Sequence, residues 1–274
     1  MTSLCGNPTK SCGYAPVNGL KMYYEIEGSG DPLVYIPPAF GFAGMKQFPA
    51  LVERHSVITV DLQGHGRTAD IPERPLTLGQ HAKDVAALLK YLGIAKADFF
   101  GESYGGGIAT LIAVDHPELA GRVATYGATF GPRQNAIKPE MLRMSSPPTP
   151  DSRNFQFQRE HYKRVAPDPD CWPKFWAKVC GIEWNEFSDA ELASIQAPVL
   201  IALGGHDFVR LEHALDTFTR IPHAELAVIP DAGHFTLFSE PEKVIPVVQR
   251  FLEEQEVKIP FATAETGYHP GETR

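Results

Sequence analysis

The chain has 274 residues, of which 43% are hydrophobic and 21% charged, a composition typical of a soluble globular protein with a large core. Its net charge of −8, without a basic stripe carrying interleaved aromatic residues, argues against nucleic acid as a partner. No apolar run approaches the roughly 18 residues that span a membrane, and residues 1–19 lack the apolar centre of a secretory signal. We therefore expect a cytoplasmic monomer or homodimer that binds neither membrane nor nucleic acid.

The first part of the chain predicts a hairpin and two buried strands. Tyr14–Glu27 alternates around Asn18-Gly19, a dipeptide that favours a type I′ turn between antiparallel strands. The apolar run Leu33–Ile36 favours a strand that is covered on both faces, and Ser56–Val60 is a second run typical of a buried strand. The helices expected in this part are Met45–Arg54 and Thr77–Leu92, the second with Thr77 as its N-cap.

Strands and helices then alternate, with one interruption. Strands are expected at Ala97–Phe100, Val123–Ala128, Pro198–Leu203 and Ala224–Ile229, and helices at Tyr104–His116, Leu211–Arg220 and Glu240–Glu253. Such alternation predicts a mostly parallel twisted sheet with helices on both faces. Residues 131–196 show no clear strand pattern and are rich in proline, so we interpret them as a helical insertion into a core of residues 1–130 and 197–257. Residues 258–274 are expected to form a polar tail.

A serine between two glycines marks the candidate nucleophile. Gly101-Glu102-Ser103-Tyr104-Gly105 matches G-x-S-x-G and lies between a predicted strand and a predicted helix, which is the context of a nucleophile elbow. Glycines at 101 and 105 relieve the crowding of this strained turn. The alternative is a glycine-rich turn with an incidental serine. We take Ser103 as the nucleophile.

A serine nucleophile requires a base and an acid that orients the base. The order expected after such an elbow is acid and then histidine. Asp207 follows one predicted strand and His234 follows the next, so both lie at strand ends, where catalytic groups gather in open parallel sheets. We predict the triad Ser103, Asp207 and His234, with Asp231 and Glu240 as the alternative acids.

The oxyanion of an acyl-transfer reaction requires two backbone donors. One is predicted to be the N–H of Tyr104, the residue after the nucleophile. The other should come from the loop after Leu33–Ile36, which begins Pro37-Pro38-Ala39-Phe40. Proline has no N–H, so Ala39 is the first residue able to donate and Phe40 is the second.

On these motifs, together with the Asp61–Thr68 turn, the chain resembles the α/β-hydrolase superfamily over about residues 14–255. The resemblance implies the α/β-hydrolase fold, a structural role for the Asp61–Thr68 turn and a helical cap formed by the insertion. Many members carry His-Gly where this chain has Pro37-Pro38. Relatives that open epoxides or displace halide use aspartate at the elbow, so Ser103 points to acyl transfer to water, which needs no cofactor and no metal.

Aromatic residues concentrate in the insertion, which holds Trp172, Trp176 and Trp184. They either line a pocket for a sizeable apolar substrate or form the core of the insertion itself. Candidate substrate-binding residues are Phe40, Trp172, Trp176 and Phe235. The leading hypothesis is a hydrolase of carboxylic esters or lactones, including bulky apolar ones such as macrolides. The alternatives are a carbon–carbon bond hydrolase, a thioesterase or a cofactor-free perhydrolase on the same triad, and a non-catalytic ligand receptor.

The four cysteines, Cys5, Cys12, Cys171 and Cys180, fit no zinc-binding spacing. In a cytosolic chain of this size, four free thiols are the default expectation.

Overall fold

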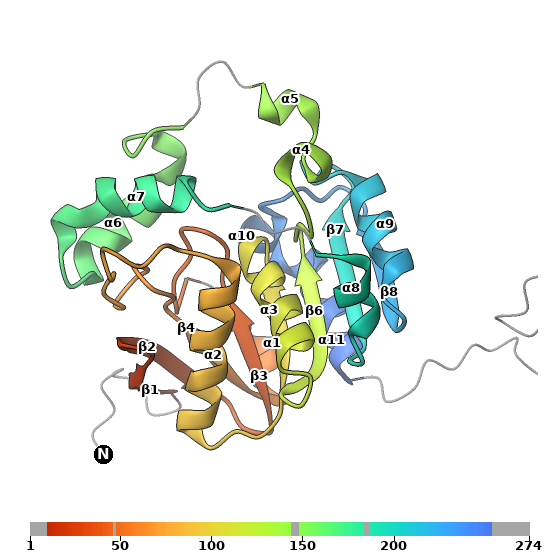
Figure 1. Ribbon diagram of the computed structural model, residues 1–274, viewed down its shortest axis with the longest axis horizontal. Helices are drawn as coiled ribbons and strands as arrows, with labels where there is room; N and C mark the ends of the chain where they lie inside the picture. The colour runs from red at the N-terminus through yellow and green to blue at the C-terminus, as the bar shows by residue number, and fades with distance from the viewer. Residues whose placement is uncertain (1–9, 46–47, 144–147, 184–186, 254–274) are drawn as a thin grey trace, which may run out of the picture.

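The computed structural model describes residues 10–45, 48–143, 148–183 and 187–253. An eight-stranded sheet in the order β1-β2-β4-β3-β5-β6-β7-β8 forms the centre of the chain (Figure 1). The β1–β2 and β2–β4 pairs are antiparallel and every other pair is parallel. The strands are β1 Lys10–Val17, β2 Leu20–Glu27, β3 Asp31–Ile36, β4 His55–Val60, β5 Ala97–Glu102, β6 Ala120–Tyr126, β7 Val199–Gly204 and β8 Ala224–Ile229. The predicted α/β-hydrolase architecture is confirmed.

Two helical layers cover the sheet. One apolar cluster joins one face of the sheet to α2 and α3, and another joins the opposite face to α1 and α11. The longer helices of the core are α2 Leu78–Leu92, α3 Tyr104–Asp115, α9 Leu211–Arg220 and α11 Ile245–Glu253, and the short ones are α1 Pro49–Val52 and α10 Thr236–Ser239. The Thr77 hydroxyl caps α2 by accepting the Gln80 N–H, as predicted.

Local chemistry explains where elements differ from the predicted ranges. Within the described residues, the helix expected at Met45–Arg54 is only Pro49–Val52, which begins at a proline that needs no N–H partner. The strand expected at Val123–Ala128 ends at Tyr126, because Gly127 turns the chain with φ +62°. The helix expected at Glu240–Glu253 is divided into a 3₁₀ turn that starts at Pro241 and helix α11.

The insertion is helical in its described part. It contains α4 Arg133–Ala136, α5 Pro139–Leu142, α6 Gln156–Val165, α7 Trp172–Cys180 and α8 Asp189–Ser194, with 3₁₀ turns at Arg153–Phe155 and Pro169–Cys171. Figure 1 shows α6 and α7 side by side at one end of the sheet, whereas α8 lies beside α9 and α3. The Trp172, Phe175 and Trp176 side chains of α7 are buried in the same apolar cluster as the sheet residues Val34 and Ile36. The cap and the sheet therefore share one continuous core on this side of the molecule.

Two findings concern the remaining expectations. Cys12 is in a disulfide, so the expectation of four free thiols is wrong for this residue. Cys171 and Cys180 are free, and Cys5, Trp184 and residues 258–274 lie outside the described residues. In the part of the chain that the structure describes, no helix is long and apolar enough to cross a membrane.

Candidate active site

Ser103 lies on the tight turn between β5 and α3. Its φ of +51° and ψ of −115° are sparsely populated for a residue with a side chain, and such strain persists only where the surroundings enforce it. A Cβ on Gly105 would overlap the carbonyl oxygen of Ile36, and a Cβ on Gly101 would overlap the carbonyl of Gly105. Both glycines are therefore required by close backbone contact, and the turn is pressed against the end of β3.

The structure brings Ser103, His234 and Asp207 together. Ser103 Oγ lies 3.0 Å from His234 Nε2, and His234 Nδ1 lies 2.9 Å from Asp207 Oδ1. The sheet order explains this meeting, because β5, β6, β7 and β8 are neighbours and the three residues follow β5, β7 and β8 at the same edge. In this arrangement the Nδ1–H of His234 donates to the carboxylate, which leaves Nε2 able to accept the serine proton.

Asp207 is held in place by burial and by a backbone hydrogen bond, in addition to its contact with His234. Its side chain is fully buried, and Oδ1 also accepts the Val209 N–H at 2.9 Å. By contrast, the side chain of Asp231 is 90% exposed and lies 4.0 Å from His206, while Glu240 pairs with Lys243 at 2.6 Å. The geometry thus favours Asp207 over both alternative acids.

Two further residues, which sequence patterns did not indicate, support His234. The Phe208 ring lies 3.8 Å from the His234 ring, between centroids, and Tyr126 donates from its hydroxyl to the Gly233 carbonyl at 2.6 Å. Phe208 directly follows the acid, and Tyr126 ends the strand next to β5. These positions in the sequence are the only features that could have pointed to the two residues. Together they restrict the position of the His234 loop.

Gly127 is a third unpredicted residue, and its replacement is expected to be costly. A Cβ there would lie 2.9 Å from His234 Nδ1 and 3.1 Å from Asp207 Oδ2, at a φ of +62° that side chains rarely adopt. Gly127→Ala should lower kcat about 100-fold, because it displaces the base and its orienting acid. Gly131→Ala is the matched control, since its Cβ would meet only ordinary contact at 3.5 Å. Equal activity of the two variants would show that the Gly127 contact is unimportant.

The candidate oxyanion donors lie near the nucleophile turn. Ala39 and Phe40 follow β3, whose end touches Gly105, and Gly41 is excluded because its N–H donates to the Pro38 carbonyl at 2.8 Å. Within the described residues, neither the Ala39 nor the Phe40 N–H donates a hydrogen bond to the protein. Phe40 adopts φ +63°. Ala39, Phe40 and Tyr104 therefore stay candidates for the oxyanion hole.

The proposed substrate-binding residues divide into two groups. Phe40 lies in an aromatic cluster of the cap, with its ring centroid 4.6 Å from Trp176 and 6.0 Å from Trp172. Both tryptophans are buried, so they form part of the cap–core interior. Phe235 is 67% exposed, and its ring lies 5.4 Å from that of His234. Of the four residues, Phe235 has the most exposed side chain, and its ring lies beside the base His234.

The Asp61–Thr68 turn supports the fold beneath this site. Asp61 is buried and accepts the N–H groups of Ala43 at 2.6 Å and Arg67 at 2.7 Å. Burial raises the pKa of Asp61 to about 7, and these two hydrogen bonds oppose the rise only in part. Thr68 accepts the Tyr23 N–H at 2.8 Å and donates to the Asp61 carbonyl, which joins the turn to β2.

Two buried histidines predict acid sensitivity. Burial lowers the pKa of His65 to about 4, and burial also lowers the pKa of His81 well below its usual value. The unfolded chain binds a proton at each ring below about pH 6.5, whereas the folded chain does not, so the contribution of these two histidines to stability is lost as the pH falls from about 6.5 towards 4. Asp61, whose pKa is raised by burial, acts in the opposite direction over the same range, so the histidine effect is read from a comparison with a variant. For His65 the full loss amounts to about 3 kcal/mol.

Urea unfolding of native protein and of a His65→Phe variant between pH 7 and 4.5 measures this loss. As the pH falls, the free energy of unfolding of the native protein should decrease relative to that of the variant. His206→Gln, which changes an exposed histidine, should keep the native slope. Identical slopes for native protein and His65→Phe would contradict the expectation.

The sheet, the serine turn and the strand-end histidine and aspartate define an α/β-hydrolase with a nucleophile-elbow serine. In agreement, a sequence model of the alpha/beta hydrolase family matches residues 28–247, and the chain belongs to this family. It is 28% identical over 263 residues to a dihydrolipoyllysine-residue acetyltransferase component of the acetoin cleaving system of Pseudomonas putida, covering 87% of this chain and 68% of that protein.

Two further similarities concern hydrolytic proteins. The chain is 29% identical over 220 residues to a poly(3-hydroxyalkanoate) depolymerase of Ectopseudomonas oleovorans, covering 73% of this chain and 75% of that protein. Among solved structures, Est816, described as an N-acyl homoserine lactone degrading enzyme, superposes with a TM-score of 0.67 at 26% identity. That superposition covers 87% of this chain and 99% of Est816.

Proposed function

We propose that the protein is a serine hydrolase that cleaves carboxylic esters or lactones through an acyl-enzyme on Ser103. The observation that carries the proposal is the continuous contact from Ser103 Oγ to His234 Nε2 at 3.0 Å and from His234 Nδ1 to Asp207 Oδ1 at 2.9 Å. A serine hydroxyl at the elbow with a base in hydrogen-bond reach fits acyl transfer.

In the proposed cycle, Ser103 Oγ attacks the substrate carbonyl carbon while His234 Nε2 takes the hydroxyl proton. The N–H groups of Ala39 and Tyr104 stabilise the oxyanion, with Phe40 as the alternative first donor. His234 then protonates the leaving oxygen. It next takes a proton from water, which attacks the acyl-enzyme, and the acid leaves as Ser103 regains its proton.

Esters and lactones are favoured over other acyl substrates by two resemblances. The chain is similar to a poly(3-hydroxyalkanoate) depolymerase and to an N-acyl homoserine lactone degrading enzyme. The cap places the aromatic rings of Phe155, Trp172, Phe175 and Trp176 around Phe40, and such an aromatic surface beside the candidate oxyanion loop favours an apolar acyl or alcohol group. This leaves the length and bulk of the apolar group to be measured.

A substrate panel tests the proposal. Native protein is assayed with p-nitrophenyl esters of increasing chain length, aliphatic and macrocyclic lactones, acyl thioesters, a vinylogous diketone and a peracid-forming mixture of acetate and peroxide. Esters or lactones should give the highest kcat/KM. A higher kcat/KM for the diketone would assign carbon–carbon bond hydrolysis, and a higher value for thioesters or peracid formation would assign those reactions. Tight ligand binding without any turnover would support a receptor instead.

A further inference from the structure

The cap reaches the first candidate oxyanion donor through the residue next to it. Phe40 directly follows Ala39, and its ring is surrounded by cap side chains. The centroid distances from Phe40 are 4.6 Å to Trp176, 5.1 Å to Phe155, 5.8 Å to Phe175 and 6.0 Å to Trp172. The cap therefore restricts the main chain of the oxyanion loop through its contacts with the Phe40 ring.

The cap also reaches the second donor, through the core. The buried Tyr104 hydroxyl shares a hydrogen bond of 2.9 Å with His81 Nδ1 on α2. The His81 ring lies edge-on to the His65 ring at 6.2 Å, and the His65 ring lies edge-on to Phe175 of α7 at 4.7 Å. Phe175 therefore takes part in both series of contacts, since its ring lies against Phe40, next to Ala39, and against His65, which leads to Tyr104.

Lys178, three residues after Phe175, fixes α7 to the core. Its Nζ lies within hydrogen-bond distance of both carboxylate oxygens of Asp70, at 2.8 and 2.9 Å, and of the carbonyl oxygens of Ile71, Pro72 and Arg74, which share its three N–H groups. Since Lys178 is on α7 and its acceptors lie on the loop before α2, these bonds join the cap to the core.

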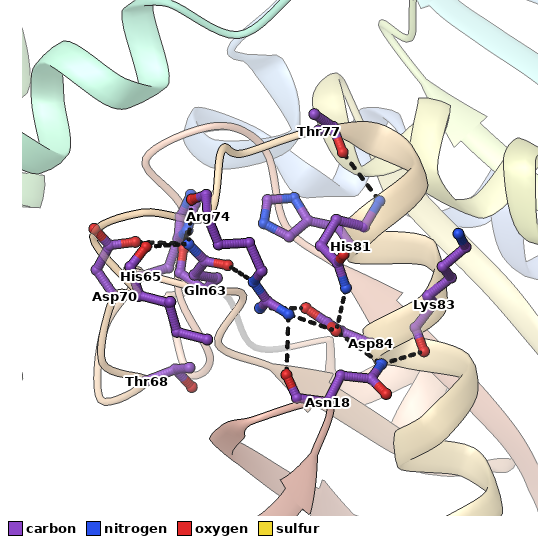
Figure 2. Close-up of polar contacts among 12 residues, drawn as sticks. Asn18, Gln63, His65, Thr68, Asp70, Arg74, Thr77, His81, Lys83 and Asp84 are labelled. Carbon is purple, nitrogen blue, oxygen red and sulfur yellow. Dashed lines mark hydrogen bonds and ion pairs between the residues drawn. The ribbon is translucent and has the colours of Figure 1, made fainter.

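The acceptor loop is itself held in place. Figure 2 shows Gln63 between Asp70 and Arg74, and Arg74 paired with the buried Asp84 of α2 at 2.8 Å. Gln63 Nε2 donates to Asp70 at 2.7 Å and to the Arg74 carbonyl at 2.9 Å. The loop thus offers Lys178 a fixed set of acceptors.

We propose that helix α7 positions both oxyanion-hole amides, with Lys178 fixing the helix and Phe175 holding the Phe40 and His65–His81–Tyr104 contacts. The inference rests on the proposed function, because it assigns the amides of Ala39 and Tyr104 to the oxyanion. Phe175 and Lys178 are positioning residues that act through others. Their loss should weaken stabilisation of the charged intermediate more than binding of the neutral substrate.

Lys178→Met tests this, with Lys174→Met as the matched control, because Lys174 is exposed on the same helix. The rate of acylation by a p-nitrophenyl ester is measured in a rapid-mixing experiment. An arylboronic acid, which bonds to the serine oxygen, serves as the analogue of the tetrahedral intermediate. In Lys178→Met the maximum acylation rate should fall about tenfold and the boronate Ki should rise by a similar factor. The ester concentration at half-maximal rate should change less than twofold.

Phe175→Leu provides a second variant, since it keeps an apolar side chain and the Lys178 contacts. It should show the same split between rate and substrate binding. A native acylation rate in folded Lys178→Met and Phe175→Leu, or a change confined to the half-maximal ester concentration, would overturn the inference alone. Absence of Ser103-dependent turnover in the native protein would overturn the proposed function and this inference with it.

Discussion

Ser103→Ala is expected to lower ester hydrolysis by about 10⁴-fold or more, because it removes the hydroxyl that forms the acyl-enzyme in the proposed mechanism. The variant should fold normally, since alanine only removes the hydroxyl and Ser103 Oγ contacts His234. Initial rates with a short-chain p-nitrophenyl ester measure the loss, after subtraction of the uncatalysed rate.

Ser194→Ala is the control for this change. Ser194 is exposed and its hydroxyl donates to the Glu191 carbonyl within α8, so its loss should leave the rate unchanged. Equal rates for Ser103→Ala and native protein would exclude a serine mechanism at this site.

Asp207→Asn is expected to lower kcat about 10⁴-fold while the protein stays folded. The carboxylate accepts the Nδ1–H of His234 at 2.9 Å, whereas an amide nitrogen there would favour the opposite tautomer. His234 Nε2 would then carry a proton and could not accept the one from Ser103. The change is measured as kcat with the same ester at pH 7.5.

Asp231→Asn separates the two candidate acids. Asp231 is 90% exposed and faces His206, so its amide variant should keep nearly native kcat. If Asp231→Asn were the crippling change and Asp207→Asn the mild one, the assignment of the acid would be wrong.

Sequence patterns predicted the sheet well because buried parallel strands are largely apolar runs. All six residues of β7 are buried, and Val17 pairs with Leu20 across a turn in which Asn18 and Gly19 both have positive φ. The element ends were harder to predict, because prolines at 49 and 241 and the turn at Gly127 act on single peptide units. These are local effects that a hydrophobic pattern averages out.

The three residues of the proposed triad could be chosen from the sequence because Ser103 directly follows β5, and Asp207 and His234 lie in the loops after β7 and β8, at the same end of the parallel strands. The residues around them could not, since their roles depend on contacts between distant segments. No sequence motif marks the contact of Phe208 with His234 or the close approach of Gly127 to the acid and base. The same holds for the contacts of Lys178 with the carbonyls of Ile71, Pro72 and Arg74. The aromatic residues of the cap were recognised as a group, but only the fold places Trp172 and Trp176 around Phe40.

Direct detection of the acyl-enzyme tests the central claim best. Native protein is mixed with a p-nitrophenyl ester, quenched in acid within the first turnover and digested, and the peptides are analysed by mass spectrometry. We predict one acyl group per chain, carried by Ser103, together with a burst of one equivalent of p-nitrophenolate. Turnover of the ester with the acyl group on another residue, or with no acyl group on the protein at all, would contradict the account.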